Sequence, residues 1–141
     1  MIKISASIIT FNEAHNIERC ITSLLPVADE IFVVDSYSTD NTKEICLRLG
    51  ARFIENPFQG HIQQKNFALE HSTHQWVLSL DADEALTPEL QQSILEVKNN
   101  PLFDGYRLNR LTNYCGHWVK YCGWYPDTKI RLVNKDKAKW M

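Results

Sequence analysis

Residues 76–84 read Trp-Val-Leu-Ser-Leu-Asp-Ala-Asp-Glu, a short apolar run that leads directly into an Asp-x-Asp pair. The apolar run predicts a buried strand, and the pair then lies at the carboxyl end of that strand, where open α/β sheets bind their ligands. Asp81 and Asp83 can together hold a divalent cation, which in turn can hold a phosphate. Because an isolated Asp-x-Asp also occurs in solvated turns, the rest of the chain decides between the two interpretations.

The composition indicates one globular domain without a basic surface. The chain has 141 residues, of which 44% are hydrophobic and 23% charged, and its formal net charge is -2. This balance fits a single domain with its own core and gives no basic footprint for nucleic acid. No apolar run has the length of a membrane span, and the first residues lack the apolar core of a signal peptide. We therefore expect a cytoplasmic protein with no nucleic-acid partner.

Strand-like runs alternate with helical patterns through the first hundred residues. The expected strands cover residues 3–10, 30–35, 52–55 and 76–80, and the expected helices cover 12–25, 42–49, 62–71 and 87–99. Asn12 is the expected start of the first helix, Asp40 a cap of the second, and Gly50 the residue that closes it. This βαβ order predicts an α/β fold with a mainly parallel sheet and helices on both faces.

The pattern changes after Pro101. Residues 104–110 and 128–134 are strand-like, and the intervening residues 111–127 are crowded with tyrosine and tryptophan. Two interpretations stay open for this segment: a hairpin that covers the sheet edge, or an aromatic wall beside a binding site.

Two groups of cysteines differ in their surroundings. Cys20 and Cys46 fall on apolar helix faces, where a thiol acts as a small hydrophobe. Cys115, His117 and Cys122 could supply metal ligands or a disulfide, but their spacing matches no common zinc pattern.

Four segments, taken in order, resemble the nucleotide-sugar-binding half of family 2 glycosyltransferases. They are residues 7–13 (SIITFNE), 33–42 (VVDSYSTDNT), 64–69 (QKNFAL) and 78–84 (LSLDADE). Within that family, the chain resembles the bacterial β-1,4-glucosyltransferases of lipopolysaccharide core synthesis. The resemblance implies a GT-A fold, which is a Rossmann-like three-layer sandwich, with a C-terminal antiparallel or hairpin addition. It covers residues 1–141 as a single domain, in which 1–100 form the donor-binding βα units and 101–141 begin an acceptor-side region.

The resemblance also implies which residues bind the nucleoside of the donor. Thr10, Asn12 and Glu13 line the strand end where the family contacts uracil and ribose. Asp35 ends the second strand, where it can accept from a base N–H or a ribose hydroxyl. Without the resemblance, Asp35 would be read as an ordinary loop acid.

Three further residues are implied at the diphosphate. Asp83 matches the family's metal ligand for Mn²⁺ or Mg²⁺, and Asp81 contacts the ribose or supports the metal through water, so the pair constitutes a DXD motif. Lys65 can approach the diphosphate, although on its own it would be read as an exposed helical lysine.

The implied reaction is an inverting transfer of sugar from a nucleotide-diphospho-sugar donor, such as UDP-glucose, to a lipopolysaccharide-core or other glycan acceptor. It requires a carboxylate base, which relatives carry near a His-Glu pair that follows the strand resembling residues 129–134. This chain ends at Met141, before such a pair. We therefore expect a donor-binding half in which the family's base is missing, and Asp127 is the best-placed candidate among Asp104, Asp127 and Glu84.

Two other classes of function stay open. One is a non-catalytic sugar-nucleotide-binding fragment or module. The other is a nucleotidyltransferase, which usually has a Gly-rich loop after its first strand, whereas residues 11–14 contain no glycine. The tail at residues 135–140 could contact an anionic inner membrane on its cytoplasmic face, where a lipid-linked acceptor would lie, or it could simply be solvated.

Overall fold

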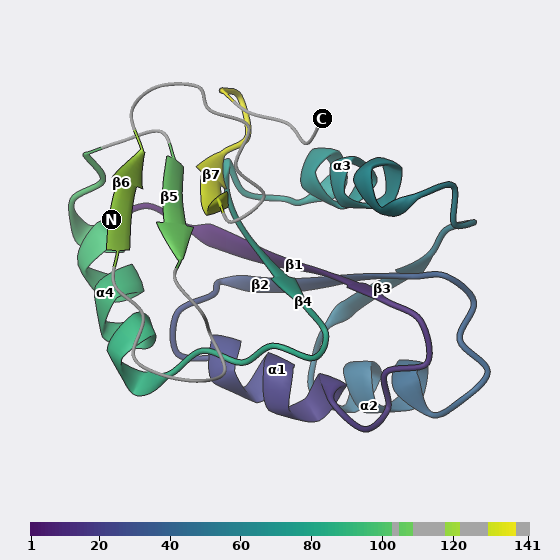
Figure 1. Cartoon of the computed structure of the whole chain (residues 1–141). Helices are drawn as coiled ribbons and strands as arrows, with labels where there is room; N and C mark the ends of the chain where they lie inside the picture. The colour runs from purple at the N-terminus through teal and green to yellow at the C-terminus, as the bar shows by residue number, and fades with distance from the viewer. Residues whose placement is uncertain (103–104, 109–117, 122–129, 138–141) are drawn as a thin grey trace.

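The computed structural model describes residues 1–102, 105–108, 118–121 and 130–137 (Figure 1). Strands and helices alternate through α4, after which three strands follow. The elements are β1 (Ile4–Thr10), α1 (Ile17–Leu24), β2 (Glu30–Asp35), α2 (Thr42–Arg48), β3 (Arg52–Glu55), α3 (His61–His71), β4 (Trp76–Asp81), α4 (Pro88–Asn99), β5 (Gly105–Leu108), β6 (Trp118–Tyr121) and β7 (Ile130–Asn134).

All seven strands belong to one sheet, in the order β3-β2-β1-β4-β7-β5-β6. The first four strands are parallel to one another. Strand β7 pairs antiparallel with both β4 and β5, and β6 pairs antiparallel with β5. The predicted α/β class, with a mainly parallel sheet and an antiparallel addition after it, is therefore confirmed.

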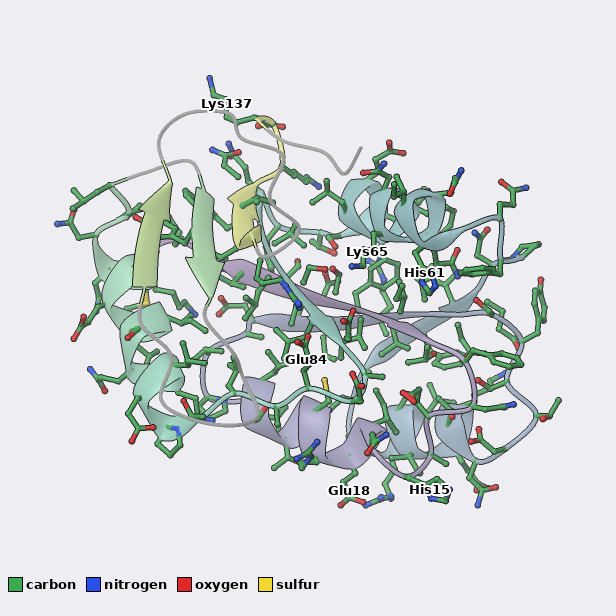
Figure 2. All side chains as sticks on the ribbon, in the orientation of Figure 1. His15, Glu18, His61, Lys65, Glu84 and Lys137 are labelled. Carbon is green, nitrogen blue, oxygen red and sulfur yellow. The ribbon has the colours of Figure 1, made fainter. Side chains whose placement is uncertain are left out.

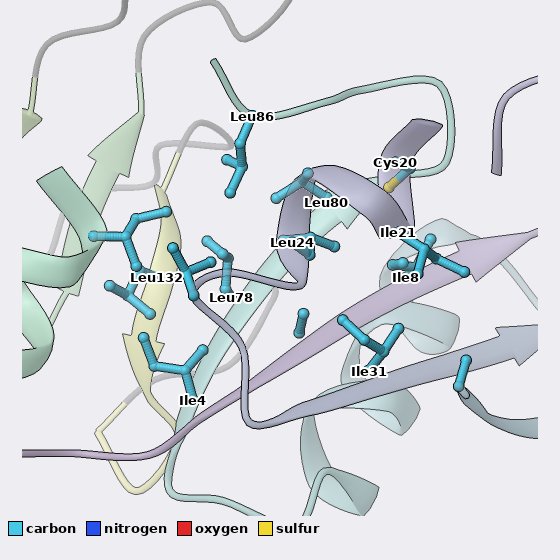
Figure 3. Close-up of a cluster of buried hydrophobic side chains, with 14 of the residues drawn as sticks. Ile4, Ile8, Cys20, Ile21, Leu24, Ile31, Leu78, Leu80, Leu86 and Leu132 are labelled. Atoms are coloured by element: carbon cyan, nitrogen blue, oxygen red, sulfur yellow. The ribbon is translucent and has the colours of Figure 1, made fainter. Parts of the chain in front are cut away.

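Helices cover both faces of the sheet, as the alternation predicts. Helices α1, α2 and α4 lie on one face and α3 lies on the other (Figure 1). The larger core cluster forms under the first group and includes Ile4 and Ile8 of β1 (Figure 3). Phe32 of β2 points the other way and packs with Ala68 of α3. Because side chains alternate along each strand, both faces of the central strands are buried, which explains their nearly continuous apolar sequences.

The predicted start of the first helix is wrong. Helix α1 begins at Ile17 with Asn16 in the N-cap position, and Asn12 lies in the preceding loop. Asn12 has a φ of 52°, and its side-chain oxygen accepts the Thr39 backbone N–H at 2.7 Å. Asparagine tolerates this left-handed conformation, so Asn12 joins two loops and does not start the helix.

Other helix ends follow their expected capping chemistry. The Thr87 side chain accepts the Leu90 N–H at 3.2 Å, immediately before Pro88 in the first turn of α4. Asp40 accepts the Thr42 N–H at 3.0 Å, although the N-cap position of α2 is Asn41.

The C-terminal strands match the expected ones within a few residues. Strand β6 falls inside the aromatic segment and pairs with β5, which supports the hairpin interpretation over these residues. The aromatic-wall interpretation and the group Cys115, His117 and Cys122 lie outside the described residues. Cys20 and Cys46 are buried free thiols, as expected, and burial raises the pKa of Cys46 to about 12.

Within the described part of the chain, no helix has both the length and the apolar character needed to cross a membrane.

Candidate functional site

The carboxyl ends of three parallel strands bring the predicted residues together. Thr10, the last residue of β1, pairs in register with Asp35 of β2. On the other side of β1, Ile9 pairs with Asp81 of β4. Since neighbouring strands lie about 4.8 Å apart, Asp35 and Asp81 are separated by roughly 10 Å across β1. Thr10, Asp35 and Asp81 therefore share one edge of the sheet, as the order of the strands predicts.

Asp35 is a buried carboxylate that is held on both of its oxygens. Its side chain is part of a residue only 1% exposed. Oδ1 accepts the Thr10 hydroxyl at 2.6 Å and the Ser38 hydroxyl at 2.5 Å, and Oδ2 accepts the Ser38 backbone N–H at 2.7 Å. Asp35 therefore ties the loop after β2 to the end of β1, and Oδ2 retains capacity for a further donor.

The loops after β1 and β2 are joined to each other next to this carboxylate. The Asn12 N–H donates to the Ser38 hydroxyl oxygen at 2.7 Å, and the Ala14 N–H donates to Asp40 at 3.1 Å. Asn12 and Tyr37 both have positive φ angles, which non-glycine residues rarely adopt. Such strain persists only where surrounding contacts hold it, and it concentrates at functional sites.

Glu13 lies among other acids at this edge. Burial, and after it the charge of Asp83, raises the pKa of Glu13, while a hydrogen bond from Asn16 opposes the rise. The charges of Asp40 and Asp81 raise it further. The charges of Asp81 and Asp83 therefore both act on the Glu13 carboxylate, and a cation would relieve that repulsion.

Lys65 lies on α3 and reaches this edge from the face of the sheet opposite to α1, α2 and α4. Its Nζ lies 3.8 Å from Oδ1 of Asp81, and the two side chains are 22% and 44% exposed. Figure 2 shows Lys65 on the side of α3 that faces the sheet. An ion pair this long and this exposed contributes little to stability. It does place an ammonium group beside the predicted metal-binding turn.

A buried amide fixes the first turns of α3 against the strand ends. Gln64 is 1% exposed, and its Nε2 donates to the Ser36 hydroxyl oxygen at 3.2 Å. Its Oε1 accepts the Asn56 side-chain N–H at 2.9 Å. Gln64 thus links α3 to the segments that follow β2 and β3, and it sets the position of the neighbouring Lys65.

The last residue of β4 and the turn that follows it carry the two predicted metal ligands, Asp81 and Asp83. Asp83 is exposed, and its backbone carbonyl accepts from Arg19 at 2.9 Å. Glu84 closes the turn, and its carboxylate accepts both the Asp81 backbone N–H and the guanidinium of Arg131 on β7. Glu84 is therefore engaged by a cation, which makes it a poor general base.

The donor chemistry of this turn fits a cation that is shared with a phosphate. Among the described residues, no three histidine, cysteine or acidic side chains gather to form a complete metal cage. Mg²⁺-like cations are held by one or two carboxylates and take their other ligands from phosphate and water. Asp81 and Asp83 supply such a pair of hard oxygen donors, so the residues present fit the predicted ion. Asp127, the predicted base, lies outside the described residues.

Sequence reasoning misses Ser38, Gln64 and Arg131 as parts of this edge. The spacing Asp35-x-x-Ser38 could have indicated a side-chain-capped turn, because Asp and Ser commonly bond to nearby backbone groups. Gln64 lies within one of the four family-like segments, but the resemblance assigns it no role. No local signal marks Arg131, since it meets Glu84 only through the order of the strands.

Comparison with known families gives a match over most of the chain. Residues 5–121 match the model of the family described as Glycosyl transferase family 2. An uncharacterized glycosyltransferase of Rickettsia typhi is 41% identical, over 99% of this chain and 49% of its own length. The lipopolysaccharide core biosynthesis glycosyltransferase LpsC of Rhizobium meliloti is 32% identical, over 97% of this chain and 53% of its own length. The chain thus spans about half the length of these curated relatives.

Solved structures agree with the sheet topology. Glucosyl-3-phosphoglycerate synthase of Mycobacterium tuberculosis, in complex with Mn²⁺, UDP and glucosyl-3-phosphoglycerate, matches with a TM-score of 0.53 and 26% identity, over 60% of this chain and 36% of its own. TarS of S. aureus, residues 1–349, matches with a TM-score of 0.54 and 25% identity, over 69% of this chain and 32% of its own. These likenesses confirm the expected GT-A fold.

Proposed function

Because the chain belongs to glycosyl transferase family 2, we propose that its carboxyl sheet edge binds a nucleotide-diphospho-sugar, UDP-glucose or a similar donor, together with Mn²⁺ or Mg²⁺. The sugar is passed with inversion to a glycan acceptor of the lipopolysaccharide-core type. The observation that carries this proposal is the convergence of Asp35, Asp81 and Lys65 on one edge of a parallel sheet.

The choice of donor and acceptor draws its support from the relatives. The M. tuberculosis synthase was solved with UDP and Mn²⁺, which supports a uridine diphosphate donor and a divalent cation. The name of LpsC supports a lipopolysaccharide-core acceptor at a sequence identity of 32%.

The residues divide into two groups along the donor. We assign Thr10, Asn12, Glu13 and Asp35 to the nucleoside end of the donor, and the bonds around Asp35 hold the loops that would enclose the base and ribose. Asp81 and Asp83 would hold the cation beside the diphosphate. A bound cation would supply positive charge near the leaving diphosphate. Lys65 adds a second positive charge from α3, which stabilises the negative charge that develops as the sugar departs.

We propose that residues 101–141 begin the acceptor side of the site. We assign the proton-accepting role to Asp127 and the donor-binding role to residues 1–100. The alternative is a donor-binding part that catalyses no transfer, and the ion pair of Glu84 with Arg131 favours it, because Glu84 is then not available as a base. A membrane-bound acceptor would place the reaction at the cytoplasmic face of the inner membrane, where the exposed Lys137 could contact anionic lipid (Figure 2).

A thermal-shift screen tests the proposed donor. UDP, UDP-glucose, GDP and CMP are added separately, with and without Mn²⁺, to the wild type and to Asp136→Asn, an exposed control that follows β7 at the opposite end of β4 from Asp81. A ligand present at 100 times its Kd stabilises by about 2.7 kcal/mol, which raises the Tm by roughly 5–10 °C for a domain of this size. We expect the uridine ligands with Mn²⁺ to give this rise in both proteins. No rise with any uridine ligand would contradict the proposal.

Turnover of UDP-glucose separates the two catalytic alternatives. Release of UDP in the presence of a lipopolysaccharide-core acceptor is compared between the wild type and Asp127→Asn. Removal of a general base lowers the rate by about 10²–10⁴-fold while leaving donor binding intact. Acceptor-dependent release that Asp127→Asn abolishes supports Asp127 as the base. Donor binding without acceptor-dependent release supports the non-catalytic alternative.

A further inference from the structure

Glu84 is the residue through which β7 contacts the turn that carries Asp81 and Asp83. Its Oε1 accepts the Asp81 backbone N–H at 2.9 Å, and its own N–H donates to the Asp81 carbonyl oxygen at 2.9 Å. Side chain and backbone of Glu84 therefore close the turn on itself, immediately where β4 ends.

Arg131 holds Glu84 in this position. Its Nη1 donates to Oε1 of Glu84 at 2.6 Å and its Nη2 donates to Oε2 at 3.2 Å. Nη1 also lies 3.4 Å from the Ser79 carbonyl oxygen of β4. A two-point arginine–carboxylate pair fixes orientation as well as distance, which a single lysine charge does not.

The ion pair between Arg131 and Glu84 is largely buried. The side chains of Arg131 and Glu84 are only 16% and 18% exposed. Loss of one partner would leave the other charge poorly hydrated, so the pair has a strong preference to stay together. Other described contacts to the turn are less constraining: the Arg19 bond to the Asp83 carbonyl is exposed, the Cys20 sulfur lies 3.7 Å from the Asp81 carbonyl, and the Lys65 ammonium lies 3.8 Å from the Asp81 carboxylate.

We propose that Arg131 is a positioning residue, which acts through Glu84 to hold the Asp81 and Asp83 carboxylates where a divalent cation and a nucleoside diphosphate can share them. This inference rests on the proposed function and deepens it. It assigns the cation affinity of the donor site partly to β7, a strand that contributes no ligand itself. It also gives Glu84 a role that is incompatible with that of general base.

The physical reason is preorganisation. Two carboxylates one residue apart repel each other, and a free turn would relax to separate them. A turn that is fixed from β7 keeps them together before the cation arrives, so less ordering is required at the moment of binding. The side chain of Asp81 remains 44% exposed and so stays accessible.

The test uses three variants of the full chain. Arg131→Met removes the charge and keeps much of the side-chain length, and Arg131→Lys keeps the charge without the two-point geometry. Arg52→Met is the matched control, because it removes another arginine–glutamate pair, at 3.1 Å from Glu30, at the amino ends of the strands. UDP affinity is measured by calorimetry with and without Mn²⁺, and exchange of the Asp81 amide is measured by NMR in the absence of any ligand.

For Arg131→Met we expect the gain in UDP affinity on adding Mn²⁺ to fall by about tenfold, the size of one charge-assisted hydrogen bond, with metal-free UDP affinity unchanged. Asp81 amide exchange should accelerate by about tenfold as well, since the acceptor of that N–H loses its anchor. Arg131→Lys should lie between Arg131→Met and the wild type, and Arg52→Met should match the wild type in both measurements. If Arg131→Met does not fold, the Arg131→Lys comparison decides the matter alone.

Each result has a distinct meaning. If Arg131→Met has the same Mn²⁺-dependent gain in UDP affinity and the same Asp81 amide exchange as the wild type, the positioning role is overturned. Where only Arg131→Lys can be measured, the same result for that variant overturns it. So does an equal loss of UDP affinity with and without metal, which would indicate general structural damage. If the wild type gains nothing from Mn²⁺, the metal part of the proposed function fails, and the Asp81 amide exchange still decides whether Arg131 fixes the turn.

Discussion

Replacing Asp35 with alanine should destabilise the fold and uncouple the two loops beside the proposed nucleoside site. The substitution removes the acceptor of three hydrogen bonds, from the Thr10 hydroxyl, the Ser38 hydroxyl and the Ser38 N–H. Hydrogen bonds to a charged group contribute about 1.5–3 kcal/mol each. Thr10 is buried, so its hydroxyl would be left without an acceptor. Ser38 is partly exposed, so water can replace much of the hydrogen bonding that its hydroxyl and N–H lose. We therefore expect a loss of about 3 kcal/mol in the free energy of unfolding.

Urea denaturation monitored by circular dichroism measures this loss for Asp35→Ala, for Asp35→Asn and for the exposed control Asp136→Ala. Asn retains one acceptor oxygen for these donors, so Asp35→Asn should lose less, roughly 1–2 kcal/mol. Both Asp35 variants should also weaken UDP binding, because the loops that would enclose the nucleoside in the proposed site lose their common anchor. A stability of Asp35→Ala within about 0.5 kcal/mol of the wild type would contradict the loss expected from these hydrogen bonds, since surface substitutions show changes of that size.

Three other contacts give predictions of their own. Burial by itself raises the pKa of Glu30, but hydrogen bonds led by Thr73 lower it below the ordinary value of 4.5. The stabilisation by Glu30 is therefore fully present above about pH 4.5 and is lost as the pH falls through the lowered pKa. Urea denaturation should show Glu30→Gln less stable than the wild type at pH 7, by a margin that shrinks as the pH is lowered below 4.5; a margin that does not change with pH would contradict this. Lys65→Met should weaken UDP binding by about tenfold and leave uridine binding unchanged, because in the proposed site the ammonium would face the diphosphate of the donor; calorimetry with both ligands checks this, and equal losses would exclude a diphosphate contact. Leu78→Ala in the core should cost about 2–5 kcal/mol in thermal or urea denaturation, against little change for the exposed Leu47→Ala, and similar costs for the two would contradict the observed packing.

The features that can be predicted from the sequence are those set by local pattern and by topology. Apolar, β-branched runs identify the four parallel strands, because both faces of these strands are buried. Once the strands are parallel, their carboxyl ends must share one edge, so Thr10, Asp35 and Asp81 can be grouped from the order of the chain alone. Thr87 and Pro88 mark the start of α4 for an equally local reason, the bonding of the first free N–H groups.

The features that could not be predicted depend on contacts between distant residues. Asn12 has the composition of a helix start, but its bonds to Ser38 and Thr39 hold it in a left-handed conformation in a loop. Arg131 and Glu84 are 47 positions apart, and they meet because β7 inserts next to β4 out of chain order. No periodicity or short motif encodes that strand order. Similarly, the sequence indicates that Asp35 ends a strand, but not that Thr10 and Ser38 donate hydrogen bonds to both of its carboxylate oxygens.

The most direct test of the account is the effect of Mn²⁺ on UDP affinity in the wild type and in Asp83→Asn, measured by titration calorimetry. Asp83→Asn keeps the size of the side chain and removes the charge that would hold the cation. Asp136→Asn serves as the exposed control. We expect Mn²⁺ to tighten UDP binding by about tenfold or more in the wild type and the control, and Asp83→Asn to lose this gain while keeping its metal-free affinity. Equal UDP affinities with and without Mn²⁺ in all three proteins would contradict it.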